Sequence, residues 1–194
     1  MTNALVLFAH PCGESFSSSL HDVVIETLKA RGWAIDDLDL YADNFSPVLT
    51  EAERRGYHEE PSNIEPVKAY VERLRSADAL VLVFPVWNFG YPAILKGFFD
   101  RVFLPGVSFN LVDGHVRPNL ANITKLAAVT TYGGTRLRAF FAGDPPRRII
   151  KRSLRYVCHP YADLTYLALY DMNRAGGAER NGFIGKVRTS MQQL

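Results

Sequence analysis

Short apolar runs alternate along this chain with segments whose apolar residues recur every three or four positions. Unbroken apolar runs are typical of strands buried on both faces of a sheet, and the longer spacing is typical of helices that bury one face. The runs predict strands over residues 4–9, 79–84, 125–131 and 164–170, with a further edge strand over 33–40, where apolar and acidic residues alternate. The helical spacing predicts helices over residues 16–31, 67–74, 92–102, 148–157 and 178–193.

Two polar stretches interrupt this alternation. Residues 41–66 show no clear periodicity, and we expect a long loop that includes a short helix. Residues 105–122 are rich in Gly, Pro and Asn, a composition typical of loops.

Strands that alternate with helices predict an α/β fold, in which a doubly wound parallel sheet of five strands carries helices on both faces. Five strands favour the flavodoxin-like order 2-1-3-4-5, and we expect residues 1–194 to form a single domain. In that order the loops after the first, third and fourth strands meet at the carboxyl edge of the sheet. Ligands of such sheets bind at this point.

The first of these loops, residues 10–17 (HPCGESFS), joins a strand to a helix. Backbone N–H groups at the helix start, together with the hydroxyls of Ser15, Ser17 and Ser18, are suited to phosphate. An ordinary N-cap by Ser15 or Ser17 explains the same serines. Neither GxGxxG nor GxxxxGK[ST] is present, which argues against a nicotinamide dinucleotide bound in the usual Rossmann manner and against a nucleotide hydrolase.

Cys12 in this loop raises a second hypothesis, a phosphatase whose thiolate attacks phosphate at a helix N-terminus. Such a loop needs an arginine six residues after the cysteine to stabilise the transition state, and that position is Ser18. We therefore reject the phosphatase. Cys12 and Cys158 lie far apart without CxxC spacing or clustered histidines, so we expect free thiols and no metal site.

The other two loops carry aromatic rings and glycines. Residues 85–91 (PVWNFGY) line a flat ligand or pack over the end of the sheet, and the sequence alone leaves both readings open. Residues 130–135 (TTYGGT) offer hydroxyls and two glycines, which allow close approach of a flat ligand or make a simple turn. Taken together, the three loops describe a site with phosphate at one end and a planar ring at the other. A flavin nucleotide fits that description.

Composition narrows the class of protein. With 47% apolar residues among 194, the chain can bury a full core. Its formal net charge of +2 is small and its Lys and Arg residues are scattered, so we expect no nucleic-acid partner. No apolar run reaches the roughly 18 residues of a membrane span and the N-terminus begins a strand, so we expect a soluble, cytoplasmic protein.

The three loops also resemble those of the NAD(P)H:quinone oxidoreductases of the DT-diaphorase type, which include ancillary flavoproteins of potassium efflux systems. The matching segments lie in about the first two thirds of the chain: AHPCGESFSSSL (9–20), DLYADNFSPVLT (39–50), FPVWNFGYPAILKGFFDRVF (84–103) and VTTYGG (129–134). The resemblance implies a flavodoxin-like homodimer that binds FAD, or FMN in some relatives. The resemblance over residues 41–50 favours FAD.

By position, the resemblance implies contacts to the phosphate end, the isoalloxazine and the pyrimidine edge of the flavin. With Ser15 and Asn88 added from the same loops, the expected cofactor-binding residues are His10, Ser15, Phe16, Ser17, Pro85, Val86, Trp87, Asn88, Phe89, Thr130, Thr131, Gly133 and Gly134. Ser17 stands where the family often has Asn. Glu179 and Arg180 stand where relatives hold the adenine half of FAD, although an exposed helix start accounts for them equally well.

The sequence departs from the family at the proton donor. Members with a defined proton relay carry a Tyr and a His after the double glycine, and residues 135–148 contain neither. We therefore expect Tyr132 to be the catalytic residue, with Tyr156 and His159 as weaker alternatives.

The expected function is a flavin-dependent oxidoreductase that takes hydride from NADH or NADPH and passes it to a quinone or similar electrophile. Both substrates would use one face of the flavin, which predicts ping-pong kinetics. A flavin or azo-compound reductase is the alternative enzyme, and a non-enzymatic electron carrier or a regulatory flavoprotein subunit of a transporter is the alternative of another class. Surplus aromatic residues add to the expectation of a homodimer whose interface completes the site: Tyr91, Phe98, Phe99, Phe103 and Phe109.

Overall fold

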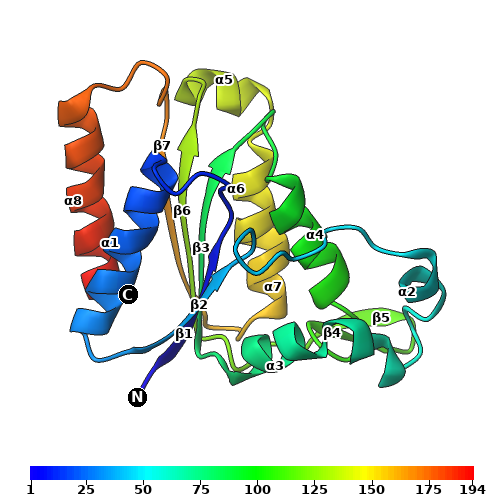
Figure 1. The fold of residues 1–194 in the computed structure, drawn as a ribbon. Helices are drawn as coiled ribbons and strands as arrows, with labels where there is room; N and C mark the ends of the chain where they lie inside the picture. The colour runs from blue at the N-terminus through cyan, green and yellow to red at the C-terminus, as the bar shows by residue number, and fades with distance from the viewer.

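The computed structural model describes residues 1–194 and has the α/β organisation expected from the sequence (Figure 1). Five parallel strands form the central sheet in the order β2-β1-β3-β6-β7, which is 2-1-3-4-5 when only these strands are counted. The predicted flavodoxin-like fold class is therefore confirmed. The strands are β1 (Asn3–Phe8), β2 (Ala34–Asp39), β3 (Ala79–Val86), β6 (Lys125–Tyr132) and β7 (Asp163–Leu169).

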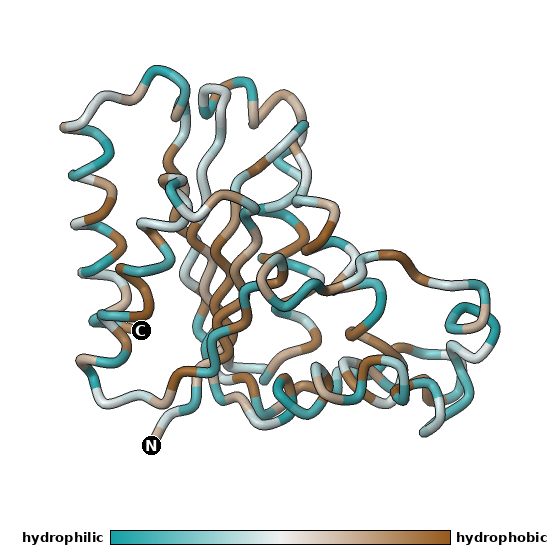
Figure 2. The backbone as a smooth tube through the Cα atoms, viewed as in Figure 1, coloured by the Kyte–Doolittle hydropathy of each residue, from teal (hydrophilic) through white to brown (hydrophobic).

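Helices cover both faces of the sheet. On one face lie α1 (Phe16–Ala30) and α8 (Gly177–Gln193), and on the other lie α3 (Lys68–Ser76), α4 (Ala93–Val102) and a continuous helix built from α6 (Pro145–Ile149), the π-helical turn η2 (Ile150–Leu154) and α7 (Arg155–Val157) (Figure 1). Because side chains alternate along a strand, the sheet serves two cores: Leu80 and Leu82 belong to the cluster that contains α4, whereas Val81 and Val83 belong to that of α1 and α8. Figure 2 shows the apolar residues concentrated on the sheet.

Three segments contain structure that the hydrophobic pattern does not predict. The long polar stretch holds two short helices rather than one, α2 (Glu51–Arg55) and η1 (Ser62–Val67), and α5 (Arg136–Phe141) follows β6. The Gly-rich and Pro-rich stretch forms an antiparallel hairpin of β4 (Phe109–Val112) and β5 (His115–Pro118). Its strands are largely exposed, so they need no alternation of apolar residues. The two-residue Asp-Gly turn at 113–114, with φ of 51° and 75°, is the sequence signal that identifies this hairpin.

β3 runs two residues further than the sequence predicts, through Pro85 and Val86. The carbonyl of Val83 accepts a hydrogen bond from the N–H of Ala9 at 3.1 Å, so the nitrogen of Pro85, two residues later, faces the same side of the strand. β1 has already ended there, at Phe8. The N–H that Pro85 lacks would have no acceptor on β1, so the proline does not interrupt the strand. The predicted end at Phe84 was wrong for this reason.

Among the aromatic residues expected at an interface, Phe98 is fully buried, whereas the other four are half-buried: Tyr91, Phe99, Phe103 and Phe109. The Phe99 ring meets those of Tyr91 and Phe103 edge to face, with centroids 5.5 and 5.3 Å away respectively. All three rings pack against the core that contains Phe98. Core packing around α4 accounts fully for Phe98 alone, and the homodimer stays a prediction.

None of the helices combines the length and apolar character that crossing a bilayer requires. Cys12 is exposed and Cys158 is buried, and both are free thiols.

Candidate functional site

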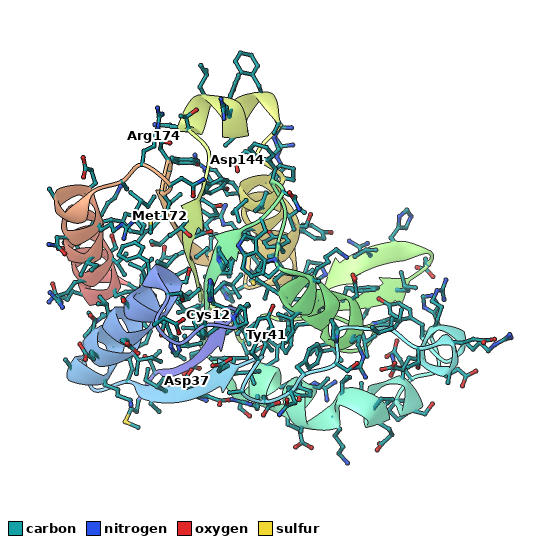
Figure 3. All side chains as sticks on the ribbon, turned by 45° about the horizontal axis from the view of Figure 1, so that its top comes forward. Cys12, Asp37, Tyr41, Asp144, Met172 and Arg174 are labelled. Atoms are coloured by element: carbon teal, nitrogen blue, oxygen red, sulfur yellow. The ribbon has the colours of Figure 1, made fainter.

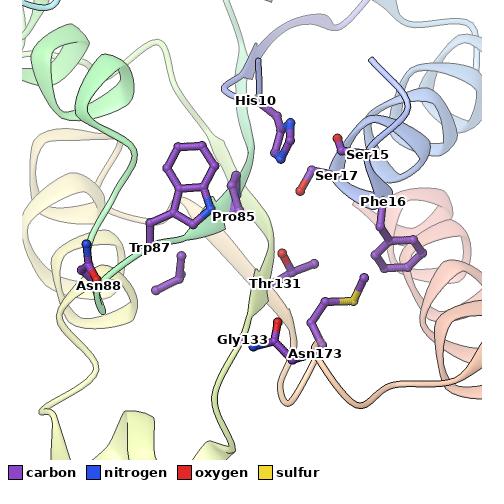
Figure 4. Close-up of a pocket in the computed structure, with 12 residues that line it drawn as sticks. His10, Ser15, Phe16, Ser17, Pro85, Trp87, Asn88, Thr131, Gly133 and Asn173 are labelled. Atoms are coloured by element: carbon purple, nitrogen blue, oxygen red, sulfur yellow. The ribbon is translucent and has the colours of Figure 1, made fainter. Parts of the chain in front are cut away.

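An open cleft of about 510 Å³ lies where the loops after β1, β3 and β6 meet, at the carboxyl edge of the sheet (Figure 4). The strand order places these loops side by side, because β1 pairs with β3 and β3 pairs with β6. Ten residues predicted from the sequence line the cleft: His10, Ser15, Phe16, Ser17, Pro85, Val86, Trp87, Asn88, Thr131 and Gly133. Met172 and Asn173, which were not predicted, complete its wall.

One end of the cleft is the start of α1. The Ser15 hydroxyl caps the helix by accepting from the N–H of Ser18 at 3.1 Å, and the Ser15 carbonyl accepts from the N–H of Ser19 at 3.1 Å. The N–H groups of Phe16 and Ser17 have no acceptor within the chain. The Ser17 hydroxyl, also without a partner, points toward the cleft (Figure 4). Ser15 thus is an N-cap, and the helix start still offers free donors to an anion.

His10 adds a further donor beside this end. Its Nδ1 accepts a hydrogen bond from the N–H of Cys12 at 3.0 Å, so in the neutral ring the proton resides on Nε2. The imidazole meets the Trp87 ring edge to face, with centroids 5.7 Å apart. A donor and a large aromatic surface therefore stand side by side in the cleft.

Trp87 is held at the rim by a tight turn. The backbones of Trp87 and Gly90 exchange two hydrogen bonds, at 3.2 and 2.8 Å. The two residues between them, Asn88 and Phe89, both have left-handed backbones, with φ of 48° and 56°. Asparagine tolerates this conformation, but for phenylalanine it costs about 1–2 kcal/mol. Strain of this kind is common at ligand sites.

The remaining wall comes from the segment after β7. The N–H of Asp171 bonds the carbonyl of Gly134 at 2.8 Å, and the N–H of Met172 bonds the carbonyl of Tyr132 at 2.9 Å. Asn173 then lies so close to Gly133 that an added Cβ there would meet its Nδ2 at 3.1 Å. The position of residues 171–173 directly after a predicted parallel strand could have identified them, as it identified the loops after β1, β3 and β6, because β7 ends at the same edge of the sheet.

Three predicted cofactor residues do not line the cleft. Thr130 is fully buried, and its hydroxyl has no partner. It points to the opposite face from Thr131, because neighbouring residues of a strand alternate. Phe89 and Gly134 lie together beside the cleft, where a Cβ on the glycine would be 4.0 Å from the ring of Phe89.

Tyr132, the expected catalytic residue, also points away from the cleft. Its side chain is 1% exposed, and its hydroxyl donates to Oδ1 of Asp144 at 2.6 Å and accepts from the Tyr166 hydroxyl at 2.7 Å. Its ring packs against Tyr170 with centroids 4.5 Å apart. Burial, with the neighbouring Tyr166 and Asp144, raises the pKa of Tyr132 above its usual value. The structure therefore places this hydroxyl in a buried network.

The weaker candidates lie at the far edge of the sheet. The N–H of His159 bonds the carbonyl of Ile123, which precedes β6, and the Tyr156 hydroxyl donates to the carbonyl of Val116 at 3.2 Å. Arg180, by contrast, lies near the cleft, with its guanidinium 5.9 Å from the centre of the Phe16 ring.

The chain is similar to known proteins in sequence and in fold. Residues 2–182 match the family described as having the flavodoxin-like fold. Rat NAD(P)H dehydrogenase [quinone] 1 is 32% identical over 146 residues, which are 67% of this chain and 53% of that protein, so the chain spans about half the length of this relative. The uncharacterized NAD(P)H oxidoreductase YcaK of Escherichia coli K12 is 28% identical over 196 residues, covering 97% of this chain and 96% of that protein.

Among solved structures, the NAD(P)H:quinone oxidoreductase from Methanothermobacter marburgensis superposes with a TM-score of 0.84 at 26% identity, covering 100% of this chain and 96% of that one. The resemblance found in the sequence is thereby confirmed. The strand order, the cleft at the switch point and the match over residues 2–182 together show that this chain belongs to the flavodoxin-like fold family.

Proposed function

We propose that this protein is a flavin-dependent oxidoreductase that passes hydride from NAD(P)H to a quinone or a similar electrophile. One observation carries the proposal: a single cleft presents free helix N–H groups at one end and a tryptophan-bearing turn at the other. A flavin nucleotide has the matching chemistry, with a phosphate at one end and a planar ring at the other. The activities named for the similar proteins support the same reaction class.

The residues present fit this cofactor. The N–H groups of Phe16 and Ser17, with the Ser17 hydroxyl and Nε2 of His10, would hold the phosphate. Trp87 would pack on the ring. A bound flavin supplies the hydride chemistry, so the protein has to orient the ring, exclude water and leave one face open for the substrates.

The polar wall after β6 and β7 would meet the edge of the ring. The Thr131 hydroxyl, the Gly133 backbone and the Asn173 amide are the hydrogen-bonding groups there. Donors at this position favour the reduced cofactor, which carries negative charge at its pyrimidine edge. No tyrosine hydroxyl reaches this wall, so we assign Tyr132 a structural role.

The charge of the cleft favours an enzyme over an electron carrier. A carrier needs acidic residues around its flavin to meet a redox partner, and none of the residues that line this cleft is Asp or Glu. The rim is instead aromatic, with Trp87 41% and Phe89 38% exposed, which suits stacking of a nicotinamide or quinone ring. An azo-compound reductase would use the same cleft with another acceptor, and turnover with both acceptor classes distinguishes the two.

We propose FAD rather than FMN. The sequence resembles FAD-binding relatives over residues 41–50, and Tyr41, at the start of this segment, lies near Cys12 of the first loop (Figure 3). Arg180 beside Phe16 adds positive charge at the same end of the cleft.

We also propose a homodimer. One exposed apolar surface available to a second copy lies on α5, where Leu137 and Phe141 are 64% and 78% exposed. Light scattering at micromolar concentration, together with the assay, tests this: a fully active monomer would contradict it.

The decisive experiment is flavin content. We expect purified protein to be yellow and to release one FAD per chain on denaturation, as identified by chromatography. Ser17→Asp would set a carboxylate against the phosphate and abolish retention of flavin. Ser19→Asp, in the same helical turn but exposed, is the matched control and should retain it, because an acidic residue in the first turn is favourable to the helix. Colourless protein that binds neither added FAD nor FMN would refute the proposal.

A further inference from the structure

A second cleft, of about 490 Å³, lies between α5 and the helix that starts at α6. Its wall is rich in cations, which come from the start of α5 and from successive turns of the other helix: Arg136, Arg147, Arg148, Lys151 and Arg152. Asp144 is the only carboxylate among the residues that line it. Figure 1 shows α5 at the carboxyl edge of the sheet, directly above α6.

Most of the positive charge of this cleft is not neutralised within the chain. None of the five cations takes part in an ion pair. Oδ1 of Asp144 accepts from the Tyr132 hydroxyl at 2.6 Å, and Oδ2 accepts from the Tyr170 hydroxyl at 3.4 Å. The carboxylate is thus hydrogen-bonded to Tyr132 and Tyr170, and its single charge offsets at most one of the five cations.

Local structure gathers these cations. Arg148, Lys151 and Arg152 are spaced three and four residues apart, so they share one side of the helix. The Arg148 guanidinium lies over the turn before α6, where a Cβ on Gly143 would be 3.7 Å from its Nη1. Arg147 is held against the Tyr166 ring, 5.5 Å from its centre. The π-helical turn in the same helix is a feature often found at functional sites.

This second cleft, called the basic cleft below, adjoins the cleft proposed to bind flavin, called the flavin cleft. Gly133 lines the flavin cleft and Arg136 the basic cleft, and three residues of chain span at most about 11 Å between Cα atoms. Tyr170 lines the basic cleft and Met172, two residues later, lines the flavin cleft. The two clefts therefore share the turns after β6 and β7, and a ligand long enough to cross these turns can occupy both.

We propose that the basic cleft binds the phosphates at the adenosine end of the dinucleotide hydride donor, and that its cations select NADPH over NADH through the 2′-phosphate. The inference rests on the proposed function, since it supposes that hydride is delivered in the neighbouring cleft. Guanidinium groups bind phosphate with paired, charge-assisted hydrogen bonds, and the 2′-phosphate is the one anionic group that NADH lacks.

The test uses 2′,5′-ADP, which carries this phosphate without the nicotinamide, and 5′-AMP, which lacks it. Calorimetric titration of the purified protein should show 2′,5′-ADP binding at least about tenfold more tightly than 5′-AMP, with a difference that shrinks at high salt. Arg148→Gln combined with Arg152→Gln should remove most of this difference. Lys186→Gln combined with Arg188→Gln, two exposed cations of α8, removes the same charge elsewhere and should preserve it. In turnover, the first pair should raise KM for NADPH about tenfold more than KM for NADH.

Several results would overturn the inference. These are equal binding of 2′,5′-ADP and 5′-AMP, binding of pyrophosphate as tight as that of 2′,5′-ADP, or equal losses in the two double variants. The titration needs neither flavin nor turnover, so it judges the basic cleft even if hydride transfer fails. Conversely, an Arg148→Gln/Arg152→Gln protein that oxidises NADPH with an unchanged KM would overturn this inference and leave the proposed function standing.

Discussion

Replacing Tyr132 by phenylalanine separates a structural hydroxyl from a catalytic one. Phenylalanine fills the same ring volume, so the contact with Tyr170 and the buried position survive. The change deletes one hydroxyl, which donates to Asp144 at 2.6 Å and accepts from Tyr166 at 2.7 Å. Any effect on the protein therefore reports on those two hydrogen bonds.

The size of the effect follows from the charge of the acceptor. A hydrogen bond to a charged group is worth about 1.5–3 kcal/mol, and Asp144 is only half-buried, so water replaces part of what is lost. The Tyr170 hydroxyl, 3.4 Å from the other carboxylate oxygen, is a weak substitute. We expect the free energy of unfolding to fall by about 2 kcal/mol. For a chain of 194 residues this lowers Tm by roughly 4–8 °C.

The assay pairs unfolding with turnover. Urea unfolding and thermal melts of Tyr132→Phe should show the loss of stability, whereas kcat measured well below Tm should stay within about twofold of the parent protein. Tyr166→Phe is the matched control: it keeps the bond from Tyr132 to Asp144 and should cost less. Unchanged stability together with a kcat reduced by roughly ten- to thousand-fold would place the hydroxyl at the reacting atoms and refute this reasoning.

Three further changes test other parts of the molecule. Gly97→Ala should lower the free energy of unfolding, measured by urea unfolding, by about 3 kcal/mol, because the new Cβ would lie 2.3 Å from the backbone oxygen of Pro47. A loss below about 0.5 kcal/mol would argue against this close approach. Burial acts to raise the pKa of Glu53, but hydrogen bonds from Thr50, the N-cap of α2, and from the Arg101 guanidinium of α4 hold this pKa below its usual 4.5. The stability that the ionised carboxylate adds is therefore present above pH 4.5 and is lost as pH falls through the lowered pKa. In thermal melts from neutral to acidic pH, Tm should fall less steeply for Glu53→Gln than for the parent protein. Glu51→Gln is the control: the Glu51 side chain is 79% exposed in its ion pair with Arg55, so the Tm of this variant should follow that of the parent. Trp87→Ala should leave Tm nearly unchanged because its ring is 41% exposed, yet slow both reduction by NAD(P)H and reoxidation by quinone in stopped-flow experiments; a change in only one half-reaction would contradict a shared stacking surface.

The sheet and most of the cleft follow from the sequence because they depend on local properties. β1, β3 and β6 are buried on both faces, and such strands need unbroken apolar runs whatever surrounds them. Once the strand order is inferred, topology alone brings the loops after these strands to one edge. Ten of the thirteen cofactor residues expected from the sequence line the cleft for this reason.

The hydrophobic pattern is silent where the outcome depends on which neighbours cover a residue. β6 is buried on both faces, so nothing in its sequence tells whether Thr131 or Tyr132 faces the ligand. The answer comes from the neighbours of the strand, with α1 and α8 on one side and the half-buried Asp144 on the other. In the same way, Arg136 joins the cations of α6 and η2 only because the turn after β6 folds α5 back over that helix. Periodicity records how much of a side chain is buried, whereas its partners depend on contacts between segments distant in the chain, and these form only when the layers pack together.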